Sequence, residues 1–521
     1  MPDIEDTGPS AEQPVARMQP KPAAALGRGS LLIAFIAMLC LIIGPGAPLI
    51  LRPFSRPVIQ VAIPASQSGR LVQEVLSKWD RKNFDIDIVP LSHDNLFKAE
   101  IGNTGQFDVL MVDDPWLAQL ATLHKLKPVP RPKFDNYLPK FVPEFLRLSY
   151  YRNRYPRRPE LAALTANDQV HVDIAKLKKV GDDYGFYALP FLGNTQAIVR
   201  NNASTGETKA VEVMAKPWSD LISKTPYFLM RMGTNNGALA DFLPILWAEG
   251  GCLIRTDSAG HELSGLHKSM AAEKAFNFSL AAAAAAPLQH ARFNDDDVQT
   301  YLLKRPDSIA ISWLAYRKFG TPQTITENKG SSVTWYGMPP AEPVNDPAND
   351  GCSLDEPRVE AGKQGPGTLG VWLLAVSSNS SHPAQAWDFI QWAFDHLPLP
   401  ATGATAAGSC ASTGEIEPAD KDLLKGYPTP FEDQLSCGAQ VAVRHSAPRP
   451  SHPKWNEIED AVGLRIRQMH WRTLTSTEVV DSADCKLHEI IENESVEDLS
   501  VRSDREKHFS SWSHCPEIPI P

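Results

Sequence analysis

The sequence predicts an α/β fold with at least two lobes, and three observations support this fold class. Short apolar segments alternate with segments of helical periodicity in the first part of the chain, which is typical of a parallel sheet flanked by helices. The chain has 521 residues, enough for two lobes with separate hydrophobic cores. Its composition, with 43% hydrophobic and 21% charged residues, is that of a folded globular protein.

The first five elements define the predicted sheet. They are a strand over residues 58–64, a helix over 70–80, a strand over 84–90, a helix over 95–102 and a strand over 107–112. The apolar run of the last strand, FDVLMV, predicts a strand that is covered on both faces. Ligands of such sheets bind beyond the carboxyl ends of the strands. We therefore expect Asp113 and Asp114, which directly follow this strand, to lie near a binding site.

The later elements follow from the same periodicity and from turn residues. The predicted strands are 185–191, 195–201, one beginning at 308, and 367–377, with a hairpin turned at 257–260. One predicted helix opens at Pro217, a second ends at Gly250-Gly251, and a third runs from residue 271 to Pro287, which stops it. Two further helices are predicted over 382–394 and 454–470, and a polar tail follows the last one. The three aspartates at 295–297 indicate a solvated helix start, because they lack the spaced ligands of a calcium loop.

Charge and the N-terminal segment limit the partners and the compartment of the chain. The net charge of −10 argues against a nucleic-acid partner, since nucleic-acid binders present a basic face. A polar segment with basic side chains, residues 1–30, precedes an apolar segment, residues 31–51. This order is that of a signal peptide or a membrane anchor, so we expect an exported chain. Whether the segment is cleaved or anchors the protein stays open.

Cysteine usage agrees with export to an oxidising compartment. Beyond Cys40 the chain has six cysteines, none in a CxxC pair and none at zinc-like spacing from a histidine. Their connectivity does not follow from the sequence. Cys410 with Cys437 is the most local pair, and buried free thiols are the alternative. We expect neither a metal site nor a cofactor.

Seven segments combine strand and helix cores with Gly, Pro and Trp in a shared order. They are FDVLMVDDPWLAQLATLHKLKPV (107–129), GFYALPFLGNTQAIVRNNAS (185–204), PWSDLI (217–222), PILWAEGGCLIRTDSAG (244–260), SIAISWLAY (308–316), LGVWLLAVSSNSSHPAQAWDFIQWAF (369–394) and RHSAPRPSHPKWNEIEDAV (444–462). In this order, over roughly residues 58–490, they resemble the family 1 extracellular solute-binding proteins of bacterial ABC importers. That class includes carbohydrate and glycerophosphate binders.

The resemblance implies a two-lobe periplasmic-binding-protein fold of type II. Each lobe would be a mainly parallel sheet flanked by helices, with an interlobe hinge that closes around a ligand. Lobe I is expected over 58–188 and 341–397, lobe II over 189–340 and 398–490, and a C-terminal tail over 491–521. The chain would cross between the lobes near Tyr187–Phe191 and near Tyr336–Pro340.

Three segments depart from the family pattern. They are LLKRPD (302–307), the stretch 148–180, which looks like an insertion with basic clusters, and the tail after residue 495. These departures bear on the identity of the ligand and leave the predicted fold unchanged.

The function implied by the resemblance is the capture of a small solute in the interlobe cleft. The solute would be a sugar or a sugar-like polyol, delivered to the membrane permease subunits of an ABC importer. The protein would work as a monomer, without enzymatic activity, in the periplasm or another extracytoplasmic space. Residues 31–51 would anchor it to the inner membrane if they persist in the mature chain.

The two adjacent aspartates are expected to have different roles. Asp113 is the candidate that faces the cleft, because a carboxylate accepts hydrogen bonds from two sugar hydroxyls. Asp114 directly precedes Pro115, which is the pattern of a helix N-cap followed by proline at the first helical position. We therefore predict one ligand residue and one capping residue.

The other candidate ligand residues are polar groups and aromatics near strand ends. Aromatic rings stack on the apolar face of a sugar at little entropic cost. The candidates, which add to Asp113, are Trp116, Asn194, Trp313, Tyr316, Trp372, Ser66 and Gln67. Each has a structural alternative: Trp116 and Trp372 could be core residues, Asn194 a turn residue, and Ser66 and Gln67 solvated loop residues. Of Trp313 and Tyr316 we expect one to stack. Arg449 is expected to anchor a loop across the lobes.

Two alternative functions compete with solute capture. A carbohydrate-active enzyme would need two carboxylates placed on opposite sides of a glycosidic bond. Adjacent Asp113 and Asp114 do not satisfy this requirement, and the chain contains no nucleophile-serine, HExxH or P-loop pattern. A membrane-tethered receptor or sensor of the same fold is the second alternative, and it depends on whether residues 31–51 are retained.

Overall fold

The computed structural model describes residues 56–492 and Cys515 with gaps, of which the longest are 153–183, 202–216, 314–332 and 397–444. All elements below belong to the unit Pro57–Pro521. Segments 1–30 and 31–51, and most of the predicted helix over 70–80 and of the stretch 148–180, lie outside the described residues. In the described part of the chain, no helix has the length and apolar character that crossing a bilayer requires.

A nine-stranded mixed sheet forms the centre of the fold. Its main path runs through β2 (Asp85–Leu91), β1 (Val58–Pro64), β3 (Val109–Asp113), β12 (Gly367–Val376), β6 (Ala188–Asn201), β10 (Ile309–Trp313) and β7 (Phe228–Leu229). β13 (Ser446–Pro448) pairs with β12, and β11 (Val333–Tyr336) pairs with β6. β1 is parallel to β2 and β3, as the strand–helix alternation predicts, whereas β12 is antiparallel to β3 and β6.

β6 is one continuous strand where the sequence predicted two, 185–191 and 195–201. The predicted break was wrong because β12 continues the ladder opposite it, with Val371 facing Gly193 and Gly370 facing Asn194. Packing also demands glycine at this place, since a Cβ on Gly193 would lie 2.2 Å from the ring of Phe145. A two-stranded antiparallel sheet, β4 (Tyr150–Arg152) with β5 (Tyr184–Phe186), lies outside this sheet.

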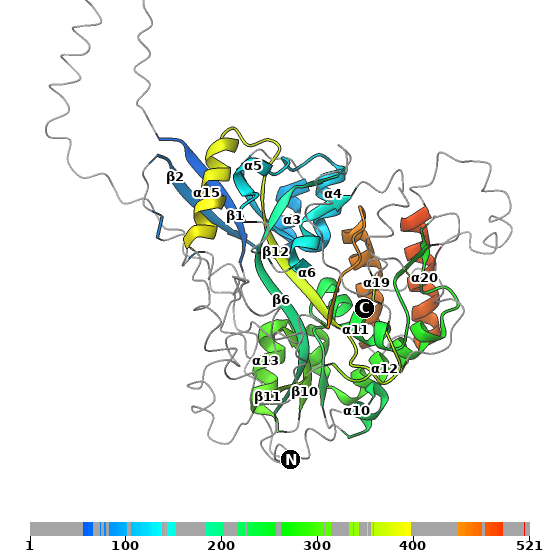
Figure 1. Cartoon of the computed structure of the whole chain (residues 1–521). Helices are drawn as coiled ribbons and strands as arrows, with labels where there is room; N and C mark the ends of the chain where they lie inside the picture. Colours follow the sequence, from blue (N-terminus) through cyan, green and yellow to red (C-terminus); the bar gives the residue numbers. More distant parts are fainter. Residues whose placement is uncertain are drawn as a thin grey trace, which may run out of the picture. The chain divides into compact units, whose positions relative to one another are not determined.

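β6 and β12 join two halves of the sheet (Figure 1). In one half β12 pairs with β3, and the ladder continues to β1 and β2. In the other half β6 pairs with β10 and, over Ile198–Asn201, with β11. This arrangement has the two α/β halves and the connecting strands that the sequence led us to expect. The exact lobe boundaries and the second crossing near Tyr336–Pro340 stay predictions.

Helices cover both halves. With β1, β2 and β3 lie α3 (His93–Ile101), α4 (Leu117–Thr122), α5 (Arg131–Phe134), α6 (Pro143–Leu148) and α15 (Pro383–His396). With β7 and β10 lie α10 (Trp218–Lys224), α11 (Asn235–Ala248), α12 (Met270–Ala285), α13 (Asp295–Lys304), α19 (Trp455–His470) and α20 (Ser476–Glu492). The remaining elements are η1 (Asp114–Trp116), η3 (Leu288–Arg292) and the hairpin of β8 (Ile254–Thr256) and β9 (Glu262–Ser264). The helix and hairpin predictions are thus confirmed for the described residues.

Local signals explain where two helices of the second half begin and end. Thr234 caps α11 by accepting a hydrogen bond from the backbone N–H of Gly237, and the chain leaves this helix through Gly250 at φ 84°. Asn294 and Asp297 form a capping box at the start of α13. The aspartates at 295–297 therefore mark a helix start, as predicted.

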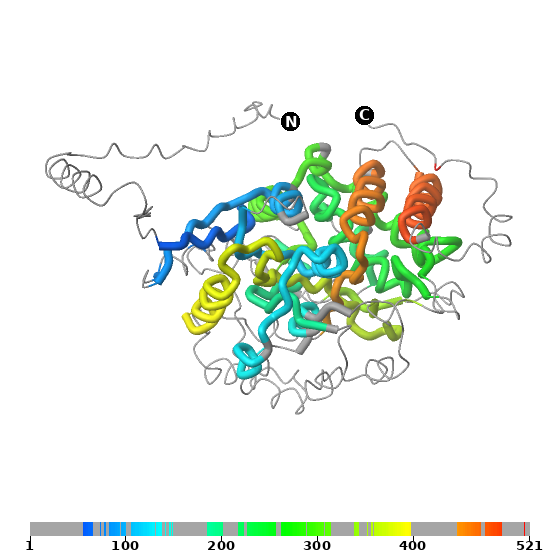
Figure 2. Tube along the Cα trace, turned by 90° about the horizontal axis from the view of Figure 1, so that it is seen from above, coloured from blue at the N-terminus to red at the C-terminus, as the bar shows by residue number. Residues whose placement is uncertain are grey.

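α20 was not predicted, because the segment after residue 470 reads as a polar tail. Its apolar side chains recur at helical spacing and are buried: Val479, Ala483, Leu487 and Ile491. α19 and α20 lie side by side (Figure 2), and α20 also contacts α12. Two disulfides are present among the described residues, Cys252–Cys352 and Cys485–Cys515, and the second ties α20 to the C-terminal segment. The suggested pair Cys410–Cys437 lies outside the described residues.

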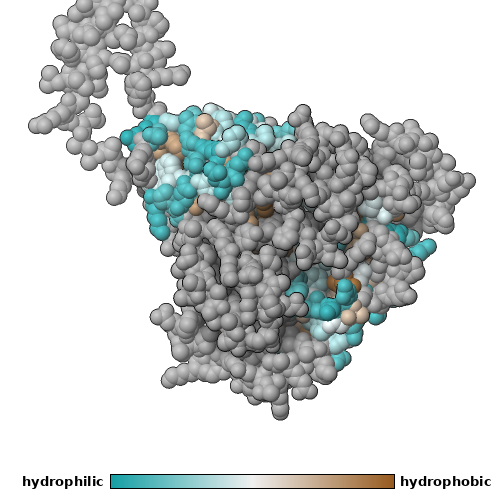
Figure 3. All heavy atoms as spheres, in the orientation of Figure 1, coloured by the Kyte–Doolittle hydropathy of each residue, from teal (hydrophilic) through white to brown (hydrophobic). Residues whose placement is uncertain are grey.

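Aromatic side chains fill the buried core. Trp116, Trp218, Trp247 and Trp455 are among the largest fully buried side chains. Trp387 is also buried, whereas Trp392 of α15 is only half-buried. On the face shown in Figure 3, the described surface over β1, β2 and α15 is mainly hydrophilic. The apolar side chains of this half therefore point inward, as the alternation of the sequence predicts.

Candidate functional site

A cavity of about 410 Å³ lies beside β6 and β12, between the two halves of the sheet. Volumes of this order are typical of sites for small molecules. The cavity is lined by Pro64, Ala65, His93, Asp113, Leu192, Gly193, Asn194, Arg231, Gly233, Thr234, Asn235, Asn236, Gly237, Asn294, Asp295, Trp313, Gly370, Val371, Trp372, Arg449, Asn456, Glu459, Asp460 and Arg467. Most of the side chains are polar or charged, and two are tryptophans.

The guanidinium of Arg449 is the centre of the charged wall. Its Nη1 donates to Asp113 Oδ2 at 3.1 Å, and its Nη2 donates to the other oxygen of Asp113, so this pair is bidentate. The same Nη2 donates to Asp114 Oδ1 at 2.6 Å, and Nη1 lies 3.8 Å from Glu459 Oε1. Arg449 is only 4% exposed. One buried guanidinium therefore faces three carboxylates.

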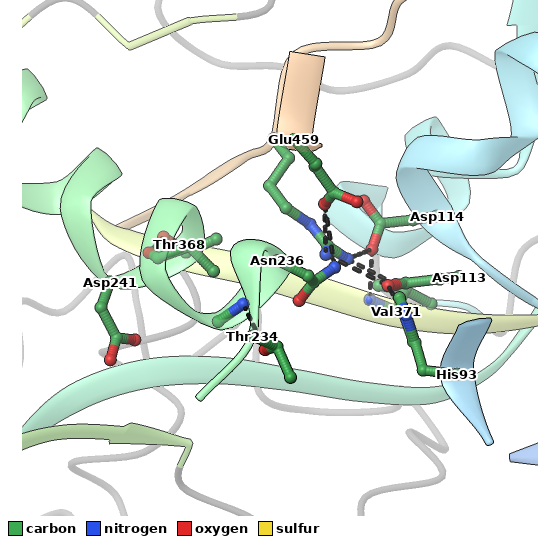
Figure 4. A network of polar contacts seen from close by, with 12 residues as sticks. His93, Asp113, Asp114, Thr234, Asn236, Asp241, Thr368, Val371 and Glu459 are labelled. Atoms are coloured by element: carbon green, nitrogen blue, oxygen red, sulfur yellow. Dashed lines mark hydrogen bonds and ion pairs between the residues drawn. The ribbon is translucent and has the colours of Figure 1, made fainter. Parts of the chain in front are cut away.

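Short elements on both sides of the sheet bring these groups together. β3 ends at Asp113, and η1 starts at Asp114. β13 pairs with the start of β12 and places Arg449 directly after it. Glu459 lies on α19, which packs against α11. Figure 4 shows the side chains of His93, Asp113, Asp114 and Glu459 converging on this place from different elements.

The predicted capping role of Asp114 is wrong. The N-cap of η1 is Asp113, and its side chain makes no capping hydrogen bond. Asp114 Oδ1 instead accepts from the backbone N–H of Val371 at 2.8 Å and from Arg449. A buried guanidinium and a strand N–H in the low-dielectric interior are stronger partners than the N–H groups of a short 3₁₀ turn. Both aspartates are therefore engaged across the sheet by the same cation.

The environment gives the two aspartates opposite pKa shifts. Burial opposes ionisation of both side chains. For Asp113 the charge of Arg449 and the hydrogen bond from His93 overcome burial and lower the pKa below its ordinary value. For Asp114 burial, together with the negative charge of Asp113, prevails over Arg449 and raises the pKa to about 7. Asp113 is thus the permanent counter-ion of Arg449.

His93 and Glu459 complete the cluster. Burial lowers the pKa of His93, but Asp113, whose Oδ2 lies 3.3 Å from His93 Nε2, more than compensates and raises it. Burial raises the pKa of Glu459 to about 7, against the attraction of Arg449 and His93. Glu459 Oε1 also accepts a hydrogen bond from Asn236 Nδ2 at 2.9 Å. The cluster therefore contains two carboxyl groups that exchange protons near neutral pH.

A second ion cluster lies at the β6 and α11 side of the cavity. Asp241 is completely buried and accepts hydrogen bonds from Arg231 Nε at 2.9 Å, from the Arg231 backbone N–H at 2.6 Å and from Gln196 Nε2 at 2.7 Å. Arg231 Nη1 also lies 3.3 Å from Asp295 at the start of α13. The guanidinium carbon of Arg231 lies 5.0 Å from the ring centre of Trp313, which is a cation–π contact.

Of the aromatic candidates, some line the wall of the cavity and one lies in the hydrophobic core. Trp313 and Trp372 line the cavity, whereas Trp116 is completely buried in the core and does not line it. Trp116 follows the strand end in η1, and its ring packs against Phe97 at 5.0 Å between centres. Trp313 rests on β12, since a Cβ on Gly370 would come within 2.9 Å of its ring. Tyr316 lies outside the described residues.

The remaining candidates are also sorted by the structure. Asn194 lies in β6 and lines the cavity, and its Oδ1 accepts from the backbone N–H of Thr195 at 2.9 Å. Ser66 and Gln67 lie outside the described residues, directly after Ala65, which does line the cavity. Arg449 bridges elements as expected, but it does so through the two aspartates.

Sequence reasoning missed several lining residues. His93 follows strand β2, so the rule that selected Asp113 would also have selected it. Asn456, Glu459, Asp460 and Arg467 share one side of α19, a pattern of polar residues at helical spacing. Arg231, Asn235 and Asn236 have no local signal of this kind, because β7, a strand of two residues, and the turn before α11 bring them to the cavity.

One cluster among the described residues, Cys485, Glu489 and Cys515, has the proximity of metal ligands. Its two cysteines form a disulfide, so they offer no thiolate to an ion.

Comparison with solved structures identifies the class of fold, that of two-lobe periplasmic binding proteins. A maltose-bound MalE3 of T. maritima matches with a TM-score of 0.55 and 15% identity, over 83% of this chain and 99% of that one. A solute-binding protein of Thermotoga lettingae bound with α-D-tagatose gives 0.54 and 15%, over 84% and 100%. One of Agrobacterium radiobacter in complex with ribitol gives 0.54 and 13%, over 84% and 100%. At these identities the similarity establishes the fold.

The family follows from the sequence match. Residues 64–396, more than half of the chain, match the family described as bacterial extracellular solute-binding protein, and the chain belongs to this family. Its members are binding proteins that work outside the cytoplasm. No curated protein matches the chain.

Proposed function

We propose that this protein captures a sugar or a sugar-like polyol in the cavity beside β6 and β12. The observation that carries the proposal is the composition of the cavity wall. Carboxylates and amides, such as Asp113, Asp460 and Asn456, stand beside the rings of Trp313 and Trp372. Polyhydroxylated ligands need this combination, since hydroxyls pair with polar groups while C–H faces pack on aromatic rings.

Hinge closure is the motion that we propose for capture. Both connections, β6 and β12, pass along the cavity, so a change in their backbone angles would open or close it. The predicted division into lobe I (58–188 and 341–397) and lobe II (189–340 and 398–490) belongs to this proposal. Arg449 and Glu459 would then reach across the cleft to the end of β3.

We further propose delivery of the solute to the permease subunits of an ABC importer by a monomeric, non-catalytic protein in the periplasm. The family and the structural neighbours support this assignment, since the neighbours with tagatose and ribitol are described as ABC transporter solute-binding proteins. The apolar segment 31–51 favours a second candidate, a receptor of the same fold that stays anchored to the inner membrane. Sequencing the N-terminus of the mature protein from a membrane-free fraction distinguishes them.

A thermal-shift screen tests the ligand class. The full chain, purified in mild detergent, is heated with monosaccharides, disaccharides, polyols and glycerophosphodiesters at millimolar concentration. A ligand of the folded state raises the Tm by mass action. If no sugar or polyol raises the Tm, the proposed ligand class is refuted.

A pair of tryptophan variants locates the binding site. Trp372→Ala removes an aromatic wall of the cavity, so the ligand-induced rise in Tm should be lost. The control Trp392→Ala removes a half-buried tryptophan of α15 that does not line the cavity, so it should lower the Tm of the free protein and preserve the ligand-induced rise. The reverse pattern would place the ligand elsewhere.

A further inference from the structure

Carboxylates outnumber guanidiniums in the cavity wall and the buried groups that contact it, although Asp114 and Asp241 do not line the cavity themselves. Arg449 faces Asp113, Asp114 and Glu459, and Arg231 faces Asp241 and Asp295. Two guanidiniums are therefore set against five carboxylates. Both guanidiniums already pair with carboxylates of the protein, so an anionic ligand would meet neutralised cations and carboxylates that repel it.

The third lining arginine, Arg467, is linked to a further carboxylate through an amide. Arg467 Nη1 donates to Asn235 Oδ1 at 2.8 Å, and its Nε donates to the carbonyl of Met232. The amide nitrogen of Asn235 donates at 3.0 Å to Asp460, which lies exposed on the cavity side of α19. Asn235 therefore orients Arg467 and Asp460 together, and with this pair included three guanidiniums face six carboxylates.

Glu459 and Asp460 present this excess on one surface of α19, which we term the acidic wall. Amides hold both carboxylates in place: Asn236 donates to Glu459 at 2.9 Å, and Asn235 donates to Asp460. These amides fix the directions of the two carboxylates without adding a positive charge, and Glu459 shares the guanidinium of Arg449, 3.8 Å away, with Asp113 and Asp114. The wall is thus preorganised for a group that brings a positive charge with it.

From this geometry we infer that the preferred solute is a sugar or polyol that carries an amine, with its ammonium group against Glu459 and Asp460. The inference rests on the proposed function and names the ligand class for the same cavity. The hydroxyls of the ligand would pair with the remaining polar lining, and the ring of Trp372 would offer a face on which a cation packs well.

The protonation of the site agrees with this assignment. Glu459 is surrounded by Arg449 after β13, His93 on α3, Asp113 at the end of β3, Asn236 on α11 and Trp455 on its own helix. Burial raises the pKa of Glu459 to about 7, so part of the excess charge is neutralised by a proton. A ligand ammonium at the acidic wall would replace this proton and drive it into solution.

Matched probes that differ in one group test the inference by calorimetry on the full chain. The open-chain set is sorbitol, N-methylglucamine and gluconate, and the ring set is glucose, glucosamine and glucuronate. We expect the amine of at least one set to bind about tenfold more tightly than its neutral partner, and the carboxylate not to bind. N-methylglucamine should also release protons at pH 7, seen as a heat that depends on the ionisation enthalpy of the buffer.

Two outcomes separate this inference from the proposed function. If neutral sugars or polyols bind as tightly as their amines, the inference is refuted while the proposed function stands. If no neutral or aminated member binds, and none of the disaccharides of the wider screen does, the proposed function fails and takes the inference with it. Tighter binding of gluconate or glucuronate would also refute the inference.

Charge-removing variants supply the matched control. Glu459→Gln and Asp460→Asn keep the shape of the acidic wall and should each weaken binding of the amine about tenfold more than binding of the neutral partner. The control Glu457→Gln removes an exposed carboxylate of the same helix that does not line the cavity, and it should leave the preference unchanged. An equal loss for neutral and aminated probes in Glu459→Gln and Asp460→Asn would contradict the assignment.

Discussion

Replacing Glu459 by glutamine should stabilise the protein above neutral pH and leave it unchanged in acid. Glu459 is a buried carboxyl whose pKa rises from 4.5 to about 7. Below pH 4.5 both the folded and the unfolded chain hold the proton. Between about 4.5 and 7 only the folded chain holds it, so the free energy of unfolding falls as the pH rises. Above 7 the folded chain contains an ionised carboxylate in a buried site.

The magnitude follows from the same pKa. A rise of about 2.5 corresponds to about 3 kcal/mol at about 1.4 kcal/mol per unit. Glutamine keeps the shape and a hydrogen-bond acceptor for Asn236 but does not ionise. Arg449 still has Asp113 as its bidentate counter-ion, so the substitution leaves no buried charge without a partner. Glu459→Gln should therefore be up to about 3 kcal/mol more stable than the parent at pH 8.

Urea unfolding of the ligand-free protein at pH 4, 6 and 8 measures the difference. Comparing the two proteins at each pH cancels the titration of groups that Glu459 does not affect, whereas the pKa of His93, which Glu459 helps to raise, should be lower in the variant. The exposed neighbour Glu457→Gln serves as the control and should show no difference that grows with pH. A Glu459→Gln variant that is less stable at pH 8 than at pH 4, relative to the parent, would refute the reasoning.

Three further substitutions probe other parts of the structure. Arg449→Met leaves buried carboxylates without their cation and should cost about 3–5 kcal/mol of stability at pH 8, measured by urea unfolding. The loss should be smaller at pH 5, because Asp114 and Glu459 are then protonated. An equal loss at both pH values would contradict this. Gly370→Ala places a Cβ within 2.9 Å of the ring of Trp313, so the ring must move. Ligand affinity measured by calorimetry should fall about tenfold, while thermal unfolding stays cooperative. Unchanged affinity would show that Trp313 does not contact the ligand. Joint replacement of Cys252 and Cys352 by alanine opens a disulfide that spans 100 residues and should cost about 4 kcal/mol in denaturant unfolding, and a loss below about 1 kcal/mol would show that the surrounding packing suffices.

Burial explains which parts of the fold could be predicted from the sequence. The strand 58–64 and the apolar run before Asp113 were predicted because a strand covered on both faces must be apolar along its length. The break predicted inside β6 failed because Gly193 and Asn194 resemble a turn in isolation, and only the pairing with β12 keeps them extended. α20 was not predicted because acidic residues lie between its apolar residues, although the spacing of those apolar residues is helical.

The candidate site shows a similar limit. The position of Asp113 beside a cavity followed from the rule on strand ends, but its partner did not, since Arg449 lies 336 residues further along the chain. The capping role of Asp114 was a local inference that a distant cation overrode. Local patterns therefore find the strand ends that border the cavity, while charge pairing is decided by tertiary contacts that no sequence window contains.

The late position of Arg449 has a consequence for assembly of the protein. Synthesis and export deliver the N-terminal elements first, so β3 and its two aspartates emerge long before the arginine that neutralises them. A chain that stops before residue 449 contains every strand of the nine-stranded sheet but lacks the guanidinium that pairs with Asp113 and Asp114. The cavity wall is therefore complete only once the C-terminal part of the chain, which supplies Arg449, Glu459, Asp460 and Arg467, has been added.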